Sequence, residues 1–197
     1  FNLQGIKINN DIPIIAIGGS NGKTTTKNLI VNVLKQKFKA HCTQGNFNNH
    51  IGVPITILNI PMDCEVAIIE LGTNHPGEIE ALCKITAPTH GLITNIGKEH
   101  LEGFGTLEAV AKEESEIYHY LLKNNGAALV NKDDVWLKRM SRSIQNIHYY
   151  SKNNVDIIST VPAIEILVKN RKIKSPLMGD YNLDNMLAAI TIGQQLG

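Results

Sequence analysis

The sequence has 197 residues, enough for one full hydrophobic core with a small appendage but too few for two large domains. Apolar residues make up 43%, charged residues 19% and aromatic residues 5%, and the formal net charge is +1. Without a basic excess or many aromatic rings for base stacking, we expect no nucleic-acid partner and no anionic-membrane partner. We also expect no bilayer-spanning segment, no cleavable leader and a cytoplasmic location, where the three scattered cysteines would be reduced, buried thiols.

The first elements in chain order are a strand, a glycine turn and a helix. Residues 12–17 form a short apolar, β-branched run that ends in Gly18 and Gly19, which is typical of a buried strand entering a tight turn. Residues 25–38 then show helical spacing of apolar side chains. This order of elements is the context that a phosphate-binding loop requires.

Further strands are predicted at residues 65–71, 90–94 and 127–130, with helices at residues 76–85 and 107–122 between them. Pro76 suits the first position of its helix. Strands that alternate with helices imply a mainly parallel sheet with helices on both faces. The expected fold is therefore α/β, of the phosphate-loop NTPase type.

After residue 132 the pattern changes. Residues 165–168 and 172–174 flank Asn170 and Arg171, which predicts a small β-hairpin subdomain. A last helix is predicted over residues 182–196.

The phosphate-binding chemistry is expected in residues 19–25. Glycines let backbone amides turn inward around a phosphate, Lys23 can reach the terminal phosphates, and the Thr24 hydroxyl can bind magnesium. Ile17 stands where the strict phosphate-loop pattern has a glycine, so a glycine turn that binds nothing is the alternative. Its place between a strand and a helix favours nucleotide binding. The predicted ATP-binding residues here are Gly19, Ser20, Asn21, Gly22, Lys23, Thr24 and Thr25.

Acidic and histidine side chains follow the other strands. Glu70 ends a strand and is placed to hold magnesium, although a solvated strand end is the alternative. His100 lies in the loop after the next strand and could complete a second metal site, or be an ordinary surface residue. Candidate carboxylates for that site lie on the next helix, in residues 111–116. We expect most of this charge run to be a solvated helix face, while one member could face the nucleotide.

Taken together, these segments resemble the Mur ligase family, which adds amino acids to the muramoyl precursor of peptidoglycan. The family's loop is the shorter Gly-x-x-Gly-Lys-Thr-Thr form, which accounts for Ile17. Three stretches, residues 45–54, 70–79 and 94–105, resemble the branch that adds D-alanyl-D-alanine. The similarity runs from Ile14 to Leu196, nearly the whole chain.

The resemblance implies that residues 1–197 are the central ATPase domain of a three-domain enzyme. The amino-terminal domain for the uridine nucleotide and the carboxyl-terminal Rossmann-like domain would be absent. It further implies ATP and Mg²⁺ as cofactors, a uridine-nucleotide muramoyl peptide and D-alanyl-D-alanine as substrates, an acyl-phosphate intermediate, and a monomer. A fragment of this kind is expected to bind ATP without performing ligation.

The resemblance also assigns roles to residues. Lys23, Glu70 and His100 would be catalytic: Lys23 contacts the β- and γ-phosphates, Thr24 and Glu70 hold a first magnesium, and Glu70 and His100 share a second. Asn46, Asn48 and Asn49 would lie where the muramoyl peptide enters, unless they only shape turns. His75 would orient substrate or begin a helix, and the ATP-binding residues Asn182 and Asn185 would contact the adenine side.

Two positions depart from the family's pattern. Tyr181 stands where the adenine-side segment usually has histidine. Glu114 stands where many relatives use a carbamylated lysine as a metal ligand. A glutamate offers the same charge, so we expect Glu114 to reach magnesium directly or through water, with Lys112 the less favoured carbamylation site.

Other functions remain open at this point. Folylpolyglutamate and cyanophycin synthetases share the loop, but residues 45–54 and 70–79 argue against them. A phosphate-loop kinase or GTPase is disfavoured because no guanine-recognition motif is evident. A non-catalytic nucleotide-binding module is the alternative from another class, against which the retention of Lys23, Thr24, Glu70 and His100 speaks.

Overall fold

The computed structural model describes residues 12–97 and 104–197. Its main sheet has six strands in the order β2-β3-β1-β4-β5-β6, and every pair is parallel. The expected α/β fold with a parallel sheet is thus confirmed. The strands are β1 (Ile14–Gly18), β2 (Ala40–Cys42), β3 (Val66–Glu70), β4 (His90–Ile93), β5 (Ala127–Asn131) and β6 (Ile147–Tyr150).

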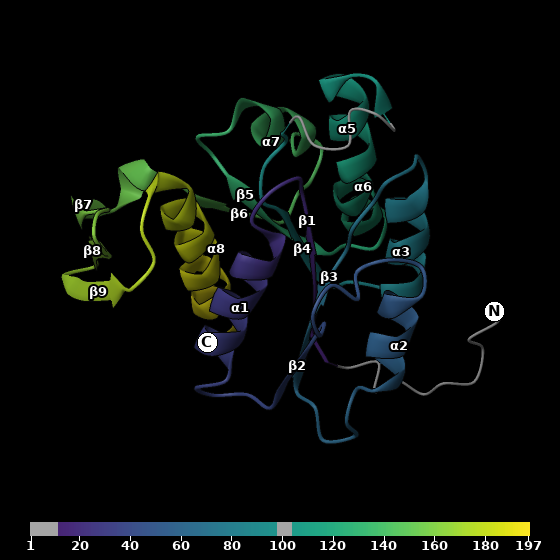
Figure 1. Cartoon of the computed structure of the whole chain (residues 1–197), viewed down its shortest axis with the longest axis horizontal. Helices are drawn as coiled ribbons and strands as arrows, with labels where there is room; N and C mark the ends of the chain where they lie inside the picture. Colours follow the sequence, from purple (N-terminus) through teal and green to yellow (C-terminus); the bar gives the residue numbers. More distant parts are fainter. Residues whose placement is uncertain (1–11, 98–103) are drawn as a thin grey trace.

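Helices cover both faces of this sheet, as Figure 1 shows. On one face lie α1 (Lys23–Leu34) and α8 (Asp180–Leu196), which pack against each other. The other face carries α2 (Gly52–Leu58), α3 (Glu78–Thr86), α5 (Leu107–Glu114), α6 (Glu116–Lys123) and α7 (Val135–Met140). Fully buried strands between two helical layers explain the near-continuous apolar runs in the sequence.

The alternation of side chains along each strand decides what faces each layer. In β3, Ile68 packs in the core beneath α1 and α8, whereas Ile69 packs in the core beneath α2 and α3. Because successive side chains point to opposite faces, Glu70 falls on the α1 side. By the same alternation in β1, Gly18 falls on the side of α5 and α6.

The carboxyl end of β1 is the point at which the chain changes direction across the sheet. From β1 the chain passes to β2 and β3 on one side, and then to β4 on the other. Parallel sheets bind ligands at such a switch point, outside the carboxyl ends of the strands. The loop after β1 occupies this position, and the ends of β3 and β4 flank it.

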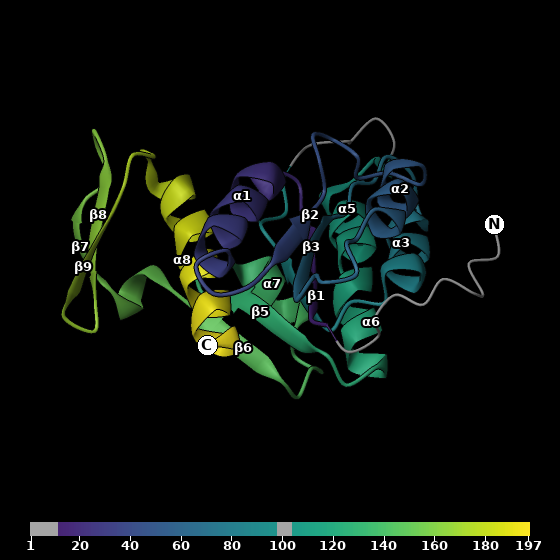
Figure 2. The ribbon, with the colours of Figure 1, turned by 90° about the horizontal axis from the view of Figure 1, so that it is seen from below.

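A small antiparallel sheet lies beyond α8 (Figure 2). The predicted hairpin is confirmed as β8 (Ile164–Val168) and β9 (Arg171–Ser175), joined through Lys169 and Asn170 at φ 48° and 62°. The sequence did not indicate the third strand, β7 (Asp156–Ser159), which pairs with β8 after the short 3-10 helix η1 (Lys152–Asn154). Ile164 and Ile166 anchor this sheet in the α1 and α8 core.

Some predicted boundaries were wrong. The helix expected over residues 107–122 is two helices, α5 and α6, which meet at Ser115; its hydroxyl donates to the Lys112 carbonyl at 2.6 Å. Pro76 precedes α3 because Gly77 adopts φ 89°, outside the helical region. Helix α1 ends at Leu34, before residue 38. The elements β2, α2, α7 and β6 were not predicted.

Within residues 12–97 and 104–197, no helix is both long and apolar enough to cross a membrane.

Candidate functional site

The loop between β1 and α1 presents backbone amides to one point. Gly22, at φ 83°, is the residue before α1, and the first intrahelical bond runs from the Thr26 amide to the Gly22 carbonyl at 2.8 Å. The amides of residues 22–25 therefore precede the hydrogen-bonded part of the helix. Such amides, together with the helix dipole, make an anion-binding site. The predicted phosphate loop thus has the required geometry.

The first half of the loop is held by hydrogen bonds to neighbouring elements. The Gly19 amide donates to Glu114 Oε2 at 2.7 Å. The Ser20 amide donates to the Asn95 carbonyl at 3.0 Å, and the Asn21 amide donates to Asn95 Oδ1 at 3.2 Å. These contacts fix the path of the loop and leave the amides at the helix start free to face a ligand.

Lys23 folds back over the loop. Its ammonium donates to the carbonyls of Gly19 and Ser20, the latter at 2.9 Å. The cation therefore lies at the phosphate loop, and its contact with the β- and γ-phosphates stays a prediction.

Glu70 is a buried carboxylate at the end of β3 with partners from two other segments. Its Oε2 accepts from the Thr24 hydroxyl at 2.9 Å, and its Oε1 accepts from Asn48 Nδ2 at 2.9 Å. Lys27 Nζ lies 3.6 Å from Oε2, and both charged side chains are only 3% exposed. One carboxylate thus joins the phosphate-loop helix to the asparagine segment of residues 46–49.

The donor set of this cluster fits magnesium. A threonine hydroxyl and a carboxylate converge within 2.9 Å beside the phosphate loop, and both are the hard oxygen ligands that magnesium prefers. His100, predicted to share a second magnesium, lies outside the described residues. Among residues 12–97 and 104–197, no group of three or more His, Cys, Asp or Glu side chains could hold a metal by itself.

Glu114 lies beneath the loop, on the α5 and α6 side of the sheet, and is 3% exposed. Burial raises the pKa of its carboxyl to about 7, although the Lys23 ammonium and the Gly19 amide act in the opposite direction. A Cβ on Gly18 would lie within 2.6 Å of Glu114 Oε2 and of Ile117 Cδ1, so a side chain there would force these two side chains to move. The role of Glu114 in holding magnesium stays a prediction.

The four residues predicted to contact substrate differ in what they contact. Asn48 is engaged with Glu70, and its carbonyl accepts from the Gly72 amide at 2.7 Å. Asn49 Oδ1 accepts from two backbone amides at the start of α2, which is the turn-shaping role allowed as an alternative. Asn46 is exposed, and His75 is exposed at the start of α3, 3.7 Å from Glu78.

A cavity of about 520 Å³ opens beside the phosphate loop. The predicted adenine-side residues Asn182 and Asn185 lie in its wall, with Tyr181 70% exposed at its mouth. Asn185 Nδ2 donates to Asn182 Oδ1 at 3.3 Å, and Asn182 Nδ2 donates to the Met178 carbonyl at 2.9 Å. The amides are therefore held in fixed orientations next to Gly22, as a base-recognition role requires.

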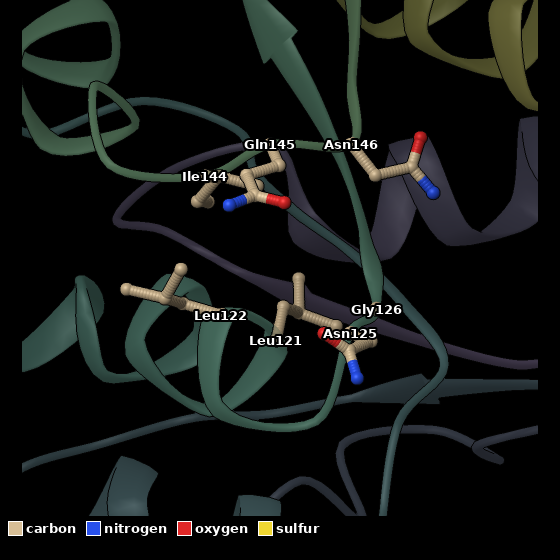
Figure 3. A pocket seen from close by; sticks show the side chains of 7 residues that line it. All are labelled: Leu121, Leu122, Asn125, Gly126, Ile144, Gln145 and Asn146. Atoms are coloured by element: carbon tan, nitrogen blue, oxygen red, sulfur yellow. The ribbon is translucent and has the colours of Figure 1, made fainter.

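A smaller cavity of about 160 Å³ lies near the opposite, amino-terminal edge of the sheet, between the end of α6 and the segment before β6 (Figure 3). None of the site residues predicted from the sequence lies in its wall. Asn125, Gln145 and Asn146 lie on the loops around it (Figure 3). The candidate site is accordingly the one at the phosphate loop.

Sequence reasoning missed two residues of this site. Lys27 lies four residues, about one helical turn, after Lys23. This spacing places both lysines on the same face of the helix, and it could have indicated that Lys27 belongs to the site. Asn95 lies within a stretch that carried the resemblance, but no role was expected for it. Its hydrogen bonds to the loop depend on β4 lying beside β1, which local sequence does not reveal.

The fold and the site define a phosphate-loop nucleotide-binding domain. A family model described as the Mur ligase middle domain matches residues 17–193. The chain belongs to the Mur ligase family.

Two curated relatives share one name. UDP-N-acetylmuramoyl-tripeptide–D-alanyl-D-alanine ligase from Haemophilus influenzae is 37% identical over 93% of this chain and 43% of its own length. The ligase of the same name from Escherichia coli is 35% identical over 93% of this chain and 43% of its own length. The chain spans less than half the length of these curated relatives.

Solved structures agree. MurF from Acinetobacter baumannii superposes with a TM-score of 0.84 at 30% identity, covering 94% of this chain and 43% of that one. MurF ligase from Thermotoga maritima, solved in complex with ADP, superposes with a TM-score of 0.80 at 30% identity, covering 94% and 46%. These comparisons confirm the predicted family. They also confirm the predicted resemblance of this chain to the branch that adds D-alanyl-D-alanine.

Proposed function

We propose that this chain is the ATP-binding domain of a ligase that adds D-alanyl-D-alanine to UDP-N-acetylmuramoyl-tripeptide. The observation that carries the proposal is the position of Glu70, which bonds Thr24 of the phosphate-loop helix through one oxygen and Asn48 through the other. The nucleotide side and the predicted substrate side therefore meet on one carboxylate. The names of the relatives supply the substrates.

In the proposed reaction, a carboxylate oxygen of the muramoyl peptide attacks the γ-phosphorus of ATP. The bond from that phosphorus to the bridging oxygen breaks, leaving ADP and an acyl phosphate. The amine of the dipeptide then attacks the acyl carbon, phosphate leaves, the nitrogen loses a proton and an amide remains. No protein nucleophile is required.

The chain's own residues act mainly on charge and position. Carboxylate and triphosphate repel each other, and the Lys23 ammonium at the loop offsets part of this repulsion. Magnesium held by Thr24 and Glu70, with His100 and Glu114 proposed near a second ion, would screen the remaining charge and polarise the phosphoryl group. The amides at the start of α1 orient the phosphates.

The nucleotide is proposed to extend from this loop into the 520 Å³ cavity. Asn182 and Asn185 would there offer amide groups to the edge of the base. Asn46, Asn49 and His75 remain proposed substrate contacts.

The decisive test is product analysis with the natural full-length protein, ATP, magnesium, the muramoyl-tripeptide nucleotide and D-alanyl-D-alanine. The expected products are the extended muramoyl peptide, ADP and phosphate in equal amounts. Transfer of a different amino acid, or ATP hydrolysis without an amide product, would contradict the proposal.

The 197-residue chain alone is expected to bind ATP in a magnesium-dependent manner and to perform negligible ligation. Calorimetric titration with ATP, with and without magnesium, tests this. Affinity that is independent of metal and unchanged by Glu70→Ala would instead indicate a non-catalytic binding module.

A further inference from the structure

Lys27 is a buried lysine whose presence the phosphate-loop chemistry does not explain. It lies in α1, and its residue is 3% exposed. A lysine ammonium is rarely buried without a partner, because removal of its hydration costs several kcal/mol. Its described neighbours are therefore the guide to what it does.

Those neighbours are Glu70 and the Gly45 carbonyl. The ammonium nitrogen lies 3.6 Å from Glu70 Oε2, the same oxygen that accepts from Thr24, and 3.5 Å from the Gly45 oxygen. It contacts the oxygen nearest the phosphate loop and leaves the other oxygen to Asn48. Lys27 therefore sits on the metal-facing oxygen of the carboxylate.

Among the residues that the structure describes, Lys27 is the cationic side chain within 4 Å of the Glu70 carboxylate. Glu70 brings a negative charge into a site where both side chains are only 3% exposed, and the Thr24 and Asn48 contacts are neutral. A buried carboxylate without a cation is costly, and would protonate or turn towards solvent. The Lys27 ammonium offsets the cost of burying this carboxylate and helps to hold it facing Thr24.

We propose that Lys27 is a positioning residue, the resident counter-ion that holds Glu70 ready for magnesium before any nucleotide binds. The inference rests on the proposed magnesium site at Thr24 and Glu70. Beyond that site, the inference is that the Lys27 ammonium is the cation beside Glu70 when no magnesium is bound. Magnesium then adds to a carboxylate that is already paired and oriented.

The test compares thermal unfolding of the 197-residue chain without nucleotide, in millimolar magnesium and in sodium chloride of equal ionic strength. Lys27→Met is expected to lower Tm by roughly 10 °C in sodium chloride, because it leaves Glu70 buried and unpaired. Magnesium should raise the Tm of this variant by about 3 °C or more. It should raise that of the wild type by clearly less.

Two further variants complete the design. Lys27→Met combined with Glu70→Gln removes both charges, so it should regain most of the lost Tm and lose the magnesium response. Lys39→Met removes a lysine from an exposed pair with Asp63, at 2.9 Å and 67% exposure on both sides, and controls for loss of a positive charge. It should respond to magnesium as the wild type does.

The proposal is overturned if magnesium shifts Lys27→Met and the wild type equally. If Lys27→Met does not fold in sodium chloride, recovery of a cooperative transition on refolding in magnesium supports the proposal. Failure to recover while the double variant folds overturns it. Failure of the proposed function is a separate result, since it would show as absence of magnesium-dependent ATP binding in the wild type.

Discussion

Two glutamates flank the phosphate loop on opposite faces of the sheet, and their surroundings differ. Glu70 is buried on the α1 face with a lysine, a threonine hydroxyl and an asparagine amide around its carboxylate. Glu114 is equally buried on the α5 face, where the Gly19 amide is its hydrogen-bond donor among the described residues. Burial raises the pKa of Glu114 to about 7.

The difference teaches that burial of a carboxylate does not by itself define its function. Glu70 lies 3.6 Å from the Lys27 ammonium and can offer an oxygen to a cation. At Glu114 burial outweighs the opposing effects of the Lys23 ammonium and the Gly19 amide, so its pKa is raised to about 7 and it acts first as a support for the loop backbone. Binding of a cation near the loop would favour its ionised form.

The largest expected effect is that of Glu70→Ala. Lys27 would be left as a buried cation without its carboxylate, which costs about 3–5 kcal/mol of stability. Urea unfolding would measure this loss, and calorimetry would measure the accompanying loss of magnesium-dependent ATP binding. If Glu70→Ala changed the free energy of unfolding by less than about 0.5 kcal/mol, the burial of Lys27 would not depend on Glu70 as described.

Glu114→Gln should change the pH dependence of stability. The folded pKa of about 7 exceeds the ordinary value of 4.5, so the wild type gains stability below pH 4.5 and loses it as the pH rises through 7. The glutamine variant cannot ionise and keeps an oxygen for the Gly19 amide. It should therefore gain up to about 3 kcal/mol over wild type near pH 8 and little near pH 5.

Unfolding of both proteins in urea across this pH range measures the effect. Glu108→Gln, at an exposed position of the same helix, controls for removal of a charge. A constant difference between wild type and Glu114→Gln at all pH values would contradict the assignment.

The smallest expected effect is that of Glu113→Gln, next to Glu114 in the chain. Glu113 accepts from the amides of Gly77 and Ile79, both at 2.8 Å, and so caps the start of α3. Glutamine can replace one of these acceptors but presents an amide donor to the other, at a cost of about 1–2 kcal/mol. Hydrogen exchange at Gly77 and Ile79 should accelerate, while ATP binding should be unchanged.

Much of this architecture could be read from the sequence. The strand, glycine turn and helix around residues 14–34 follow from periodicity, because a strand buried on both faces must be continuously apolar. The short strand β2 and the short helices α2 and α7 were not predicted, since three to seven residues carry too little periodicity. The break at Ser115 depends on local hydrogen bonding within an otherwise helical pattern.

The sequence by itself determined the chemistry available at the loop, because Gly22, Lys23 and Thr24 are adjacent in the chain and their spacing is local. It also determined that Glu70 ends a strand. Only the tertiary structure decided which face each glutamate occupies and which cation accompanies it. Lys27 and Glu70 are far apart in the chain and meet because β3 lies beside β1 and beneath α1. The alternation of side chains along β3 turns Glu70 towards Lys27, and a helix on the opposite face brings Glu114 to the Gly19 amide.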